Sequence, residues 1–241
     1  MPDANPISSE TLEVLRKIPT QTLIDGLWVM GWPMSFIHGA KPLQAGQHMA
    51  GRAVTLRFVP HRPDLAADKP KGDQSAEYVA IELCGPEEVL VIDAMGWEYS
   101  SIGGDIKFLR MMQLKAGGLV TDGAARDSNT LKGYGFPVYA ANTTAKQGPA
   151  EFWPWQVNDA IQCGRVLVRP GDAVVGDDDG AVVVPAAAVD EVISIAHERE
   201  EVEEVIKAQL EIEQCSPGKY YPFNDLTWKL FEEKTGKKRT G

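Results

Sequence analysis

The sequence contains few of the residues that build disulfide frameworks or zinc sites. Its three cysteines are far apart in a chain of 241 residues and form no CxxC pair. Free thiols in a reducing compartment are therefore expected. The four histidines show no ligand spacing, and Glu201 stands where an HExxH motif after His197 would need its second histidine. The pattern thus excludes the zinc-protease motif.

Excess positive charge and long apolar runs are also missing. The formal net charge is -10, which argues against a broad phosphate-binding surface, so no nucleic-acid partner is expected. No apolar run approaches the length that spans a bilayer, and residues 1–6 lack a basic region followed by an apolar one. We therefore expect a cytoplasmic protein without a membrane partner.

Three glycine-containing signatures are absent. The chain has no GxSxG, no Walker loop and no complete GxGxxG, so nothing in it supports a serine hydrolase, a nucleotide triphosphatase or a quinone methyltransferase. The hydrophobic content is 44% and the charged content 24%, an ordinary globular composition. Without a clear linker, we predict a single domain over residues 1–241, with an aromatic and helical C-terminal arm at about 214–241.

The order of the expected elements indicates a layered α/β sandwich. Strands are predicted at 51–59, 87–93, 119–121, 137–141 and 173–184, and helices at 8–31 (as a pair, the second capped by Thr20), 75–83 and 186–213. The run Asp177-Asp178-Asp179 resembles a metal site, but a structural turn between two strands is favoured. Residues 147–158, which include Trp153-Pro154-Trp155, are expected to form a loop whose role is simple packing, a pocket wall or an oligomer contact.

The stretch from 103 to 127 holds the candidate active site. A Gly-Gly-Asp turn opens an apolar, helix-like run, and a short β-type segment follows it before the pair Arg126-Asp127. Amides at the start of a helix face outward, and the helix dipole favours an anion there. A small carboxylate would suit the main-chain amides of Gly104, Asp105, Ile106 and Lys107.

Arg126 and Asp127 add complementary chemistry. The Arg126 guanidinium could hold the same anion in a bidentate fork. Asp127 offers a hard oxygen ligand suited to Mg²⁺ or Mn²⁺, and Asp105 could position or deprotonate a water. The alternative is that Arg126 and Asp127 form a surface ion pair after a strand, and the spacing alone favours neither interpretation.

At these residues the sequence resembles the RraA-like family, which contains metal-dependent 4-hydroxy-4-methyl-2-oxoglutarate/4-carboxy-4-hydroxy-2-oxoadipate aldolases and regulators of ribonuclease E. The aldolase pattern is an Asp, twenty residues, then Arg-Asp, which Asp105 and Arg126-Asp127 reproduce. Further matches are Thr20-x-x-Leu23-x-Asp25-x-Leu27, Gly51-Arg52-Ala53-Val54-Thr55, Thr121-Asp122-Gly123, Pro170-Gly171-Asp172 and Gly176-Asp177-Asp178-Asp179-Gly180.

The resemblance implies a class II aldolase that releases pyruvate, with oxaloacetate decarboxylation as a side activity. It implies an αββα sandwich similar to the phosphohistidine swivelling domain, assembled as a homotrimer or a dimer of trimers. Carried over, the amides of 104–107 hold the pyruvate carboxylate and Arg126 binds the pyruvyl oxygens. Asp127 ligates Mg²⁺ or Mn²⁺, and Asp105 matches the acid that orders a metal-bound water. A neighbouring subunit would add Glu200 or Glu203, and the sequence does not choose between them.

Two other functions remain open at this point. A non-catalytic, protein-binding regulator of ribonuclease E needs no Asp105, so the presence of that residue disfavours it. A Schiff-base aldolase would use Lys107 or Lys115, but the Arg-Asp pair suits a metal better. The 147–158 segment, residues 30–43 and the arm depart from the family pattern, which leaves the identity of the 4-hydroxy-2-oxo acid open.

Overall fold

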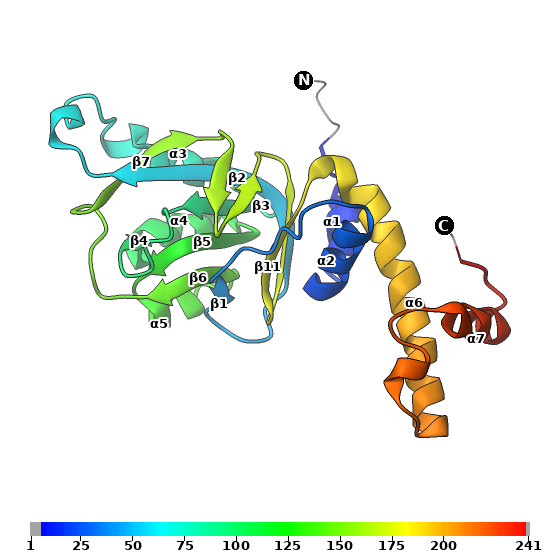
Figure 1. Ribbon diagram of the computed structural model, residues 1–241. Coiled ribbons are helices and arrows are strands. Elements are labelled where there is room, and N and C mark those ends of the chain that lie inside the picture. Colours follow the sequence, from blue (N-terminus) through cyan, green and yellow to red (C-terminus); the bar gives the residue numbers. More distant parts are fainter. Residues whose placement is uncertain (1–5, 240–241) are drawn as a thin grey trace.

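The fold is built around a nine-stranded sheet, as shown by a computed structural model that describes residues 6–239 (Figure 1). The strands of this sheet are β1 (Lys41–Pro42), β2 (Met49–Pro60), β3 (Glu88–Asp93), β4 (Ser101–Gly103), β5 (Gly118–Ala125), β6 (Val138–Thr143), β7 (Phe152–Val157), β10 (Ala173–Asp177) and β11 (Gly180–Val184). Their order is β1-β6-β5-β3-β2-β10-β11, with β4 beside β5 and β7 beside β2. A separate antiparallel hairpin comprises β8 (Ile161–Cys163) and β9 (Val166–Val168).

The centre of the sheet is parallel and buried on both faces. Strands β2, β3, β5 and β6 pair in parallel, and short helices connect them: α3 (Ala76–Glu82), α4 (Asp105–Leu114) and α5 (Ser128–Lys132). Successive β3 side chains enter different apolar clusters, with Val89 and Val91 in one and Leu90 and Ile92 in the other. Because side chains alternate along a strand, a continuous apolar run such as that of β3 fills two cores at once.

Helices cover the sheet on two sides, which confirms the αββα arrangement. On one side α3 and α4 pack on the parallel strands through residues such as Ile81 and Phe108. On the other, α1 (Ser9–Leu15), α2 (Thr20–Val29) and the first half of α6 (Val189–Glu213) pack on β10 and β11. Between these layers, Val174 and Val183 of the antiparallel strands meet Val91 of the parallel ones. The sheet is thus nearly closed on itself.

The 147–158 segment is not the loop that its composition indicates. Half of it, residues 152–157, forms β7, which pairs antiparallel with β2 and has a register shift at Arg57/Phe58. Phe152 and Trp153 are buried and Trp155 is half-buried, so of the two tryptophans that suggested a pocket wall or an oligomer contact, only Trp153 lies in the interior. Pro154 is tolerated because β7 pairs with β2 alone and lies at an edge of the sheet.

The acidic run 177–179 fastens α2 and a nearby loop to the sheet. The Asp177 carboxylate accepts hydrogen bonds from the amide and the hydroxyl of Thr20, at 2.8 and 2.9 Å. Asp178 accepts from the Gly46 amide at 2.6 Å. The sequence predicts Thr20 as the N-cap of α2, but this prediction is wrong. Pro19 holds the N-cap position, and the Thr20 side chain binds Asp177 instead. These contacts support the interpretation of the run as a structural turn.

Helix α6 connects the body of the protein to the C-terminal arm. Its first half buries Val192 and Ala196 against the sheet, and its second half buries Val202 and Ile206 against the arm. The helix has 25 residues, but charged residues recur along it. Within the described part of the chain, none of the helices combines the length and the apolar character needed to cross a bilayer.

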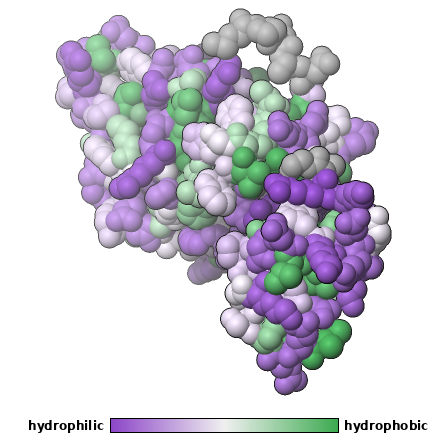
Figure 2. Space-filling model, turned by 45° about the vertical axis from the view of Figure 1, so that its right-hand side comes forward, coloured by the Kyte–Doolittle hydropathy of each residue, from purple (hydrophilic) through white to green (hydrophobic). Residues whose placement is uncertain are grey.

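The arm folds back onto the outer half of α6 and forms a separate small apolar cluster. Helix α7 (Asp225–Thr235) contributes Leu230 and Phe231, and Tyr220 precedes it. The arm projects from the body as its own lobe, mostly covered by hydrophilic residues in the view of Figure 2. Lys237 pairs with Glu201 at 2.7 Å. Residues 240–241 of the expected arm, like residues 1–5 at the other end, lie outside the described residues.

The contact between Glu213 and the arm predicts a loss of arm docking in acid. Hydrogen bonds from Lys219 and then from Gln209 lower the pKa of Glu213 from 4.5 to about 2. A carboxylate with a lowered pKa stabilises the fold above its unfolded pKa, and this contribution disappears as the pH falls through the folded value. We therefore expect amide protection in residues 217–235, measured by hydrogen exchange, to decrease between about pH 4.5 and pH 2.

A pair of variants checks this assignment. Glu213→Gln should remove the pH dependence in that window, because the amide does not titrate. The exposed Glu211→Gln on the same helix should leave the profile of the unmodified protein unchanged. An acid transition of the arm that persists in Glu213→Gln would contradict the role of this carboxylate.

Candidate active site

Pairing between β4 and β5 brings the two halves of the candidate site together. Ser101 lies opposite Ala124 and Gly103 opposite Ala125, and the Arg126 amide donates to the Gly103 carbonyl at 3.1 Å. The start of α4 therefore lies directly beside the end of β5. The strand is longer than its sequence indicates, because Asp122 and Gly123 lie in its interior and not at its end.

Asp127 links three elements of the site. Its backbone has a positive φ of 57° at the junction between β5 and α5. Its carboxylate Oδ2 accepts a hydrogen bond from the Asp105 amide at 3.2 Å and lies 3.3 Å from Nε of Arg126. The side chains of Arg126 and Asp127 are 40% and 37% exposed, so both can be reached by a small molecule.

The first two amides of α4 donate hydrogen bonds to carboxylate oxygens of the protein itself. Asp105 donates its amide to Asp127, and Ile106 donates its amide to Oδ1 of Asp105 at 2.7 Å. This is the behaviour expected of an anion cradle at a helix start. A substrate carboxylate bound there would replace these internal acceptors. The Ile106 side chain is 83% exposed, so its amide carries the expected role and its side chain does not.

Lys107 does not offer its side chain to the site. Its ammonium pairs with Glu77 of α3 and donates to the Ile102 carbonyl at 3.1 Å. Lys115 follows the last residue of the ten-residue helix α4, about 15 Å along the helix axis from its start at Asp105. Neither lysine is thus placed as the free amine that Schiff-base chemistry needs.

Gly104 is required by the close approach of these groups. A Cβ at this position would lie 2.0 Å from Oδ2 of Asp127 and 2.8 Å from Cγ of Arg126. The backbone of Gly104 is extended, with φ of -144°, so the requirement comes from space and not from conformation. A side chain here would push apart the two residues on which the site depends.

A solvent-open pocket of about 620 Å³ lies next to Arg126 and Asp127. Its other walls are polar and come from the start of α5, the end of β6 and the chain that follows β6: Ser128, Asn129, Thr130, Thr143, Thr144 and Ala145. Of the site residues predicted from the sequence, Arg126 and Asp127 line this pocket. Residues 104–107 do not line it, but they lie next to Asp127, which accepts a hydrogen bond from the Asp105 amide.

The sequence alone did not point to the threonines at the end of β6 or to the polar residues at the start of α5. One signal could have found them. The carboxyl ends of neighbouring parallel strands meet at one edge of a sheet, which is where α/β proteins bind ligands. Strands β5 and β6 are such neighbours, so the polar residues that follow both were candidates.

The carboxylates beside the pocket suit a divalent cation that binds few protein ligands and keeps several waters. No group of three or more histidine, cysteine, aspartate or glutamate side chains able to hold a metal occurs among residues 6–239. Mg²⁺ commonly binds through one or two carboxylates and keeps several waters. Asp127, with Asp105 beside it, fits that mode, whereas a zinc site built from several protein ligands does not.

Glu200 and Glu203 lie far from this pocket within one chain. Both are on α6, on the side of the molecule opposite α4 and α5 (Figure 1). Burial raises the pKa of Glu200, and Glu203 lies 3.7 Å from Lys207. Either glutamate could enter a site like this one only in a second copy of the chain.

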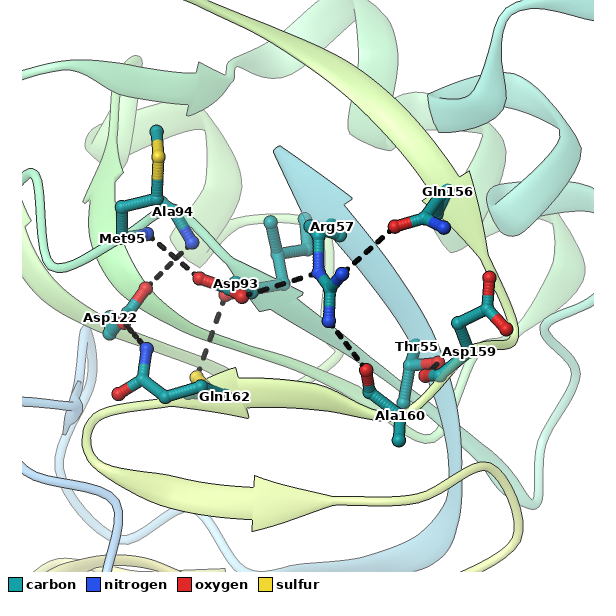
Figure 3. A network of polar contacts seen from close by, with 12 residues as sticks. Thr55, Arg57, Asp93, Ala94, Met95, Asp122, Gln156, Asp159, Ala160 and Gln162 are labelled. Carbon is teal, nitrogen blue, oxygen red and sulfur yellow. Dashed lines mark hydrogen bonds and ion pairs between the residues drawn. The ribbon is translucent and has the colours of Figure 1, made fainter. Parts of the chain in front are cut away.

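A buried polar network supports the strand that carries the site (Figure 3). Asp122 of β5 accepts hydrogen bonds from the amides of Ala94, Gly96 and Gly164, at 2.7, 3.1 and 3.1 Å. Next to it, burial first and the charge of Asp122 second raise the pKa of Asp93. Asp122 thus braces the turn after β3 and the β8–β9 hairpin, and it takes no part in the pocket.

Arg57 completes this network on the β2 side. Its guanidinium donates to Gln156 at 2.9 Å and to the Ala160 carbonyl at 2.6 Å, and it lies 3.8 Å from Asp93. The partial burial of both charges is compensated by these contacts. The network fixes the ends of β2, β3 and β5 relative to one another, and so fixes where Arg126 and Asp127 emerge.

Comparison with known proteins identifies the family. The sequence pattern of RraA-like proteins, described as Aldolase/RraA, matches residues 20–183. The chain belongs to the RraA-like family. A relative in Halalkalibacterium halodurans, named "putative 4-hydroxy-4-methyl-2-oxoglutarate aldolase", is 32% identical over 185 residues, which cover 77% of this chain and 81% of the relative.

Solved structures agree with this assignment. The RraA-like chain is 31% identical to Streptomyces coelicolor RraAS2, described as an unusual member of the RNase ES inhibitor RraA protein family, with a TM-score of 0.73 over 82% of this chain and 95% of that one. An uncharacterised Pseudomonas syringae protein, 22% identical, shares the fold with a TM-score of 0.72 over 89% of this chain and 98% of that one.

Proposed function

We propose that this RraA-like protein is a divalent-metal-dependent aldolase that cleaves a 4-hydroxy-2-oxo acid and releases pyruvate. The observation that carries the proposal is the convergence of Arg126 and Asp127 with the first amides of α4 beside a solvent-open polar pocket. The name of the Halalkalibacterium halodurans relative supports the same reaction class.

The 2-oxo acid end of the substrate would bind where the chain's own carboxylates now lie. Its carboxylate would accept hydrogen bonds from the amides of Asp105 and Ile106, and the guanidinium of Arg126 would hold the 2-oxo oxygen. Cleavage of the bond between C3 and C4 places negative charge on that oxygen. A preorganised cation there stabilises the transition state more than the ground state.

Asp127 is the proposed ligand of Mg²⁺ or Mn²⁺. When bound, the metal would supply Lewis-acid stabilisation of the developing enolate. The carboxylate of Asp105 lies at the mouth of the cradle and would position the water that takes up the proton of the 4-hydroxyl and returns one to C3. Oxaloacetate decarboxylation passes through the same enolate, so we propose it as a side activity.

Removal of divalent metal is the direct test. Purified protein treated with a chelator should lose pyruvate release from 4-hydroxy-2-oxo acids by at least about 100-fold, because the charge developing in the transition state is no longer neutralised. Added Mg²⁺ or Mn²⁺ should restore the rate, measured by coupled reduction of pyruvate. Undiminished pyruvate release after chelation would refute metal dependence.

Assembly as a homotrimer or a hexamer is part of the proposal. A carboxylate from α6 of a second copy, Glu200 or Glu203, would then complete the pocket. The exposed, polar lining of the pocket in one chain leaves room for such a contribution.

A regulator that binds a ribonuclease is the second candidate. It is favoured by one observation, the 31% identity to Streptomyces coelicolor RraAS2. Capture of a ribonuclease by the purified protein, together with no pyruvate release in the presence of Mg²⁺ or Mn²⁺, would favour this function over the aldolase.

A further inference from the structure

The pocket continues beyond Arg126 and Asp127 as a wall of small polar side chains. Ser128, Asn129 and Thr130 form the first turn of α5, and Thr143 ends β6. In the described part of the chain, the side-chain hydroxyl and amide groups of these four residues have no hydrogen-bond partner. They are therefore available to a ligand as both donors and acceptors.

Thr144 shows the contrasting case within the same wall. Its hydroxyl donates to the Tyr99 carbonyl at 3.3 Å and accepts from the Lys146 amide at 3.1 Å. Thr144 thus holds the chain after β6 in place, while Thr143 beside it keeps its hydroxyl free. The backbone that carries Thr143 is therefore held in position before any ligand arrives, which reduces the entropy lost on binding.

Within one chain, and apart from the metal proposed at Asp127, the pocket has no spare positive charge. Arg126 is the one cation among its lining residues, and Asp127 balances it at 3.3 Å. The two lysines that border the site are engaged elsewhere, Lys107 by Glu77 and Lys146 by Glu151. A substrate that carries a second carboxylate would bring it next to the carboxylates of Asp127 and Asp105 with no cationic side chain of this chain as its partner, and like charges repel.

We propose that the part of the substrate beyond the 2-oxo acid is uncharged and hydroxylated. This inference rests on the proposed aldolase function and specifies its substrate class: 4-hydroxy-2-oxo acids whose C4 carries a hydroxyalkyl group. The name of the Halalkalibacterium halodurans relative instead specifies a dicarboxylate for that protein. Neutral hydroxyl groups on the substrate match the four free groups of the wall, and a site built to hydrogen-bond a substrate hydroxyl discriminates against an analogue that lacks it.

The reaction balances without any additional reactant. The 4-hydroxyl loses its proton, and C4 becomes the carbonyl of a hydroxyaldehyde. The electron pair of the C3–C4 bond passes to C3 and the 2-oxo group as the pyruvate enolate. One proton returns to C3 and gives pyruvate, so substrate equals the sum of the two products.

Two five-carbon substrates that differ only at C5 provide the test. 4,5-Dihydroxy-2-oxopentanoate ends in a hydroxymethyl group and 4-hydroxy-2-oxoglutarate in a carboxylate, while 4-hydroxy-2-oxopentanoate, which ends in a methyl group, serves as the reference. With Mg²⁺ present, kcat/KM for the dihydroxy acid should exceed that for the dicarboxylate by at least about tenfold. Equal or faster cleavage of the dicarboxylate overturns the inference while leaving the aldolase function intact. Pyruvate release from none of the three refutes both.

Variants of the wall separate recognition from folding. Thr143→Val should lower kcat/KM for the dihydroxy acid by roughly 3- to 10-fold, the effect of one lost hydrogen bond, and leave the methyl substrate unchanged. Asn129→Arg should move the preference toward the dicarboxylate by supplying the missing cation. Thr235→Val, in the distant arm, is the matched control and should alter no substrate. Equal loss on the hydroxymethyl and methyl substrates in Thr143→Val would show a structural effect and overturn the assignment of the wall.

Discussion

Replacement of Asp127 by alanine is expected to lower kcat/KM for pyruvate release by roughly 10²- to 10³-fold, the scale for loss of one preorganised electrostatic group in a transition state. The Asp127 side chain touches both halves of the site, through the Asp105 amide and Nε of Arg126. Its removal takes away the proposed metal ligand and frees the guanidinium to move. Steady-state kinetics with coupled pyruvate detection measures the effect.

Asp127→Asn is the control for backbone effects. The φ of 57° at this position penalises most residues, but asparagine tolerates it nearly as well as aspartate. The asparagine variant should therefore keep the melting temperature of the parent protein and lose activity about as strongly as the alanine variant. Full activity in Asp127→Asn would exclude a charged metal ligand here.

Gly104→Ala is expected to lower kcat/KM by about 100-fold or more without unfolding the protein, because a misplacement of about 1 Å at a reacting centre has effects of that size. The added methyl group would lie 2.0 Å from Oδ2 of Asp127, so either the start of α4 or the Asp127 side chain must move. The extended backbone of Gly104 itself accepts alanine. Kinetics and a thermal melt should be measured together.

Gly218→Ala serves as the matched control for this substitution. Its added methyl group would meet its nearest neighbour, Oγ of Ser216, at an ordinary 3.5 Å, far from the site. It should keep both activity and melting temperature. Normal activity in Gly104→Ala would mean that Asp127 can leave its position without consequence, and the proposed geometry would be wrong.

Local sequence was sufficient wherever the physical cause is local. Apolar alternation and helical periodicity predicted β2, β3 and α6 to within a few residues, because a strand or helix must bury the side chains on its inner face. The start of α4 was predicted from the Gly-Gly-Asp turn that opens it. The prediction of a loop at 147–158 was wrong because pairing with β2 outweighed the loop tendency of Trp153-Pro154-Trp155.

The sequence by itself determined the groups of the candidate site: the spacing of Asp105 and Arg126-Asp127, the amides at a helix start and the lack of alternative catalytic motifs. Only the tertiary structure decided which of these groups meet. Pairing of β4 with β5 joins the two halves, the pairing of β5 with β6 brings Thr143 to the pocket, and the contact of α3 with α4 ties Lys107 to Glu77. The reason is physical, since each of these contacts joins residues distant in sequence and depends on packing that no local pattern encodes.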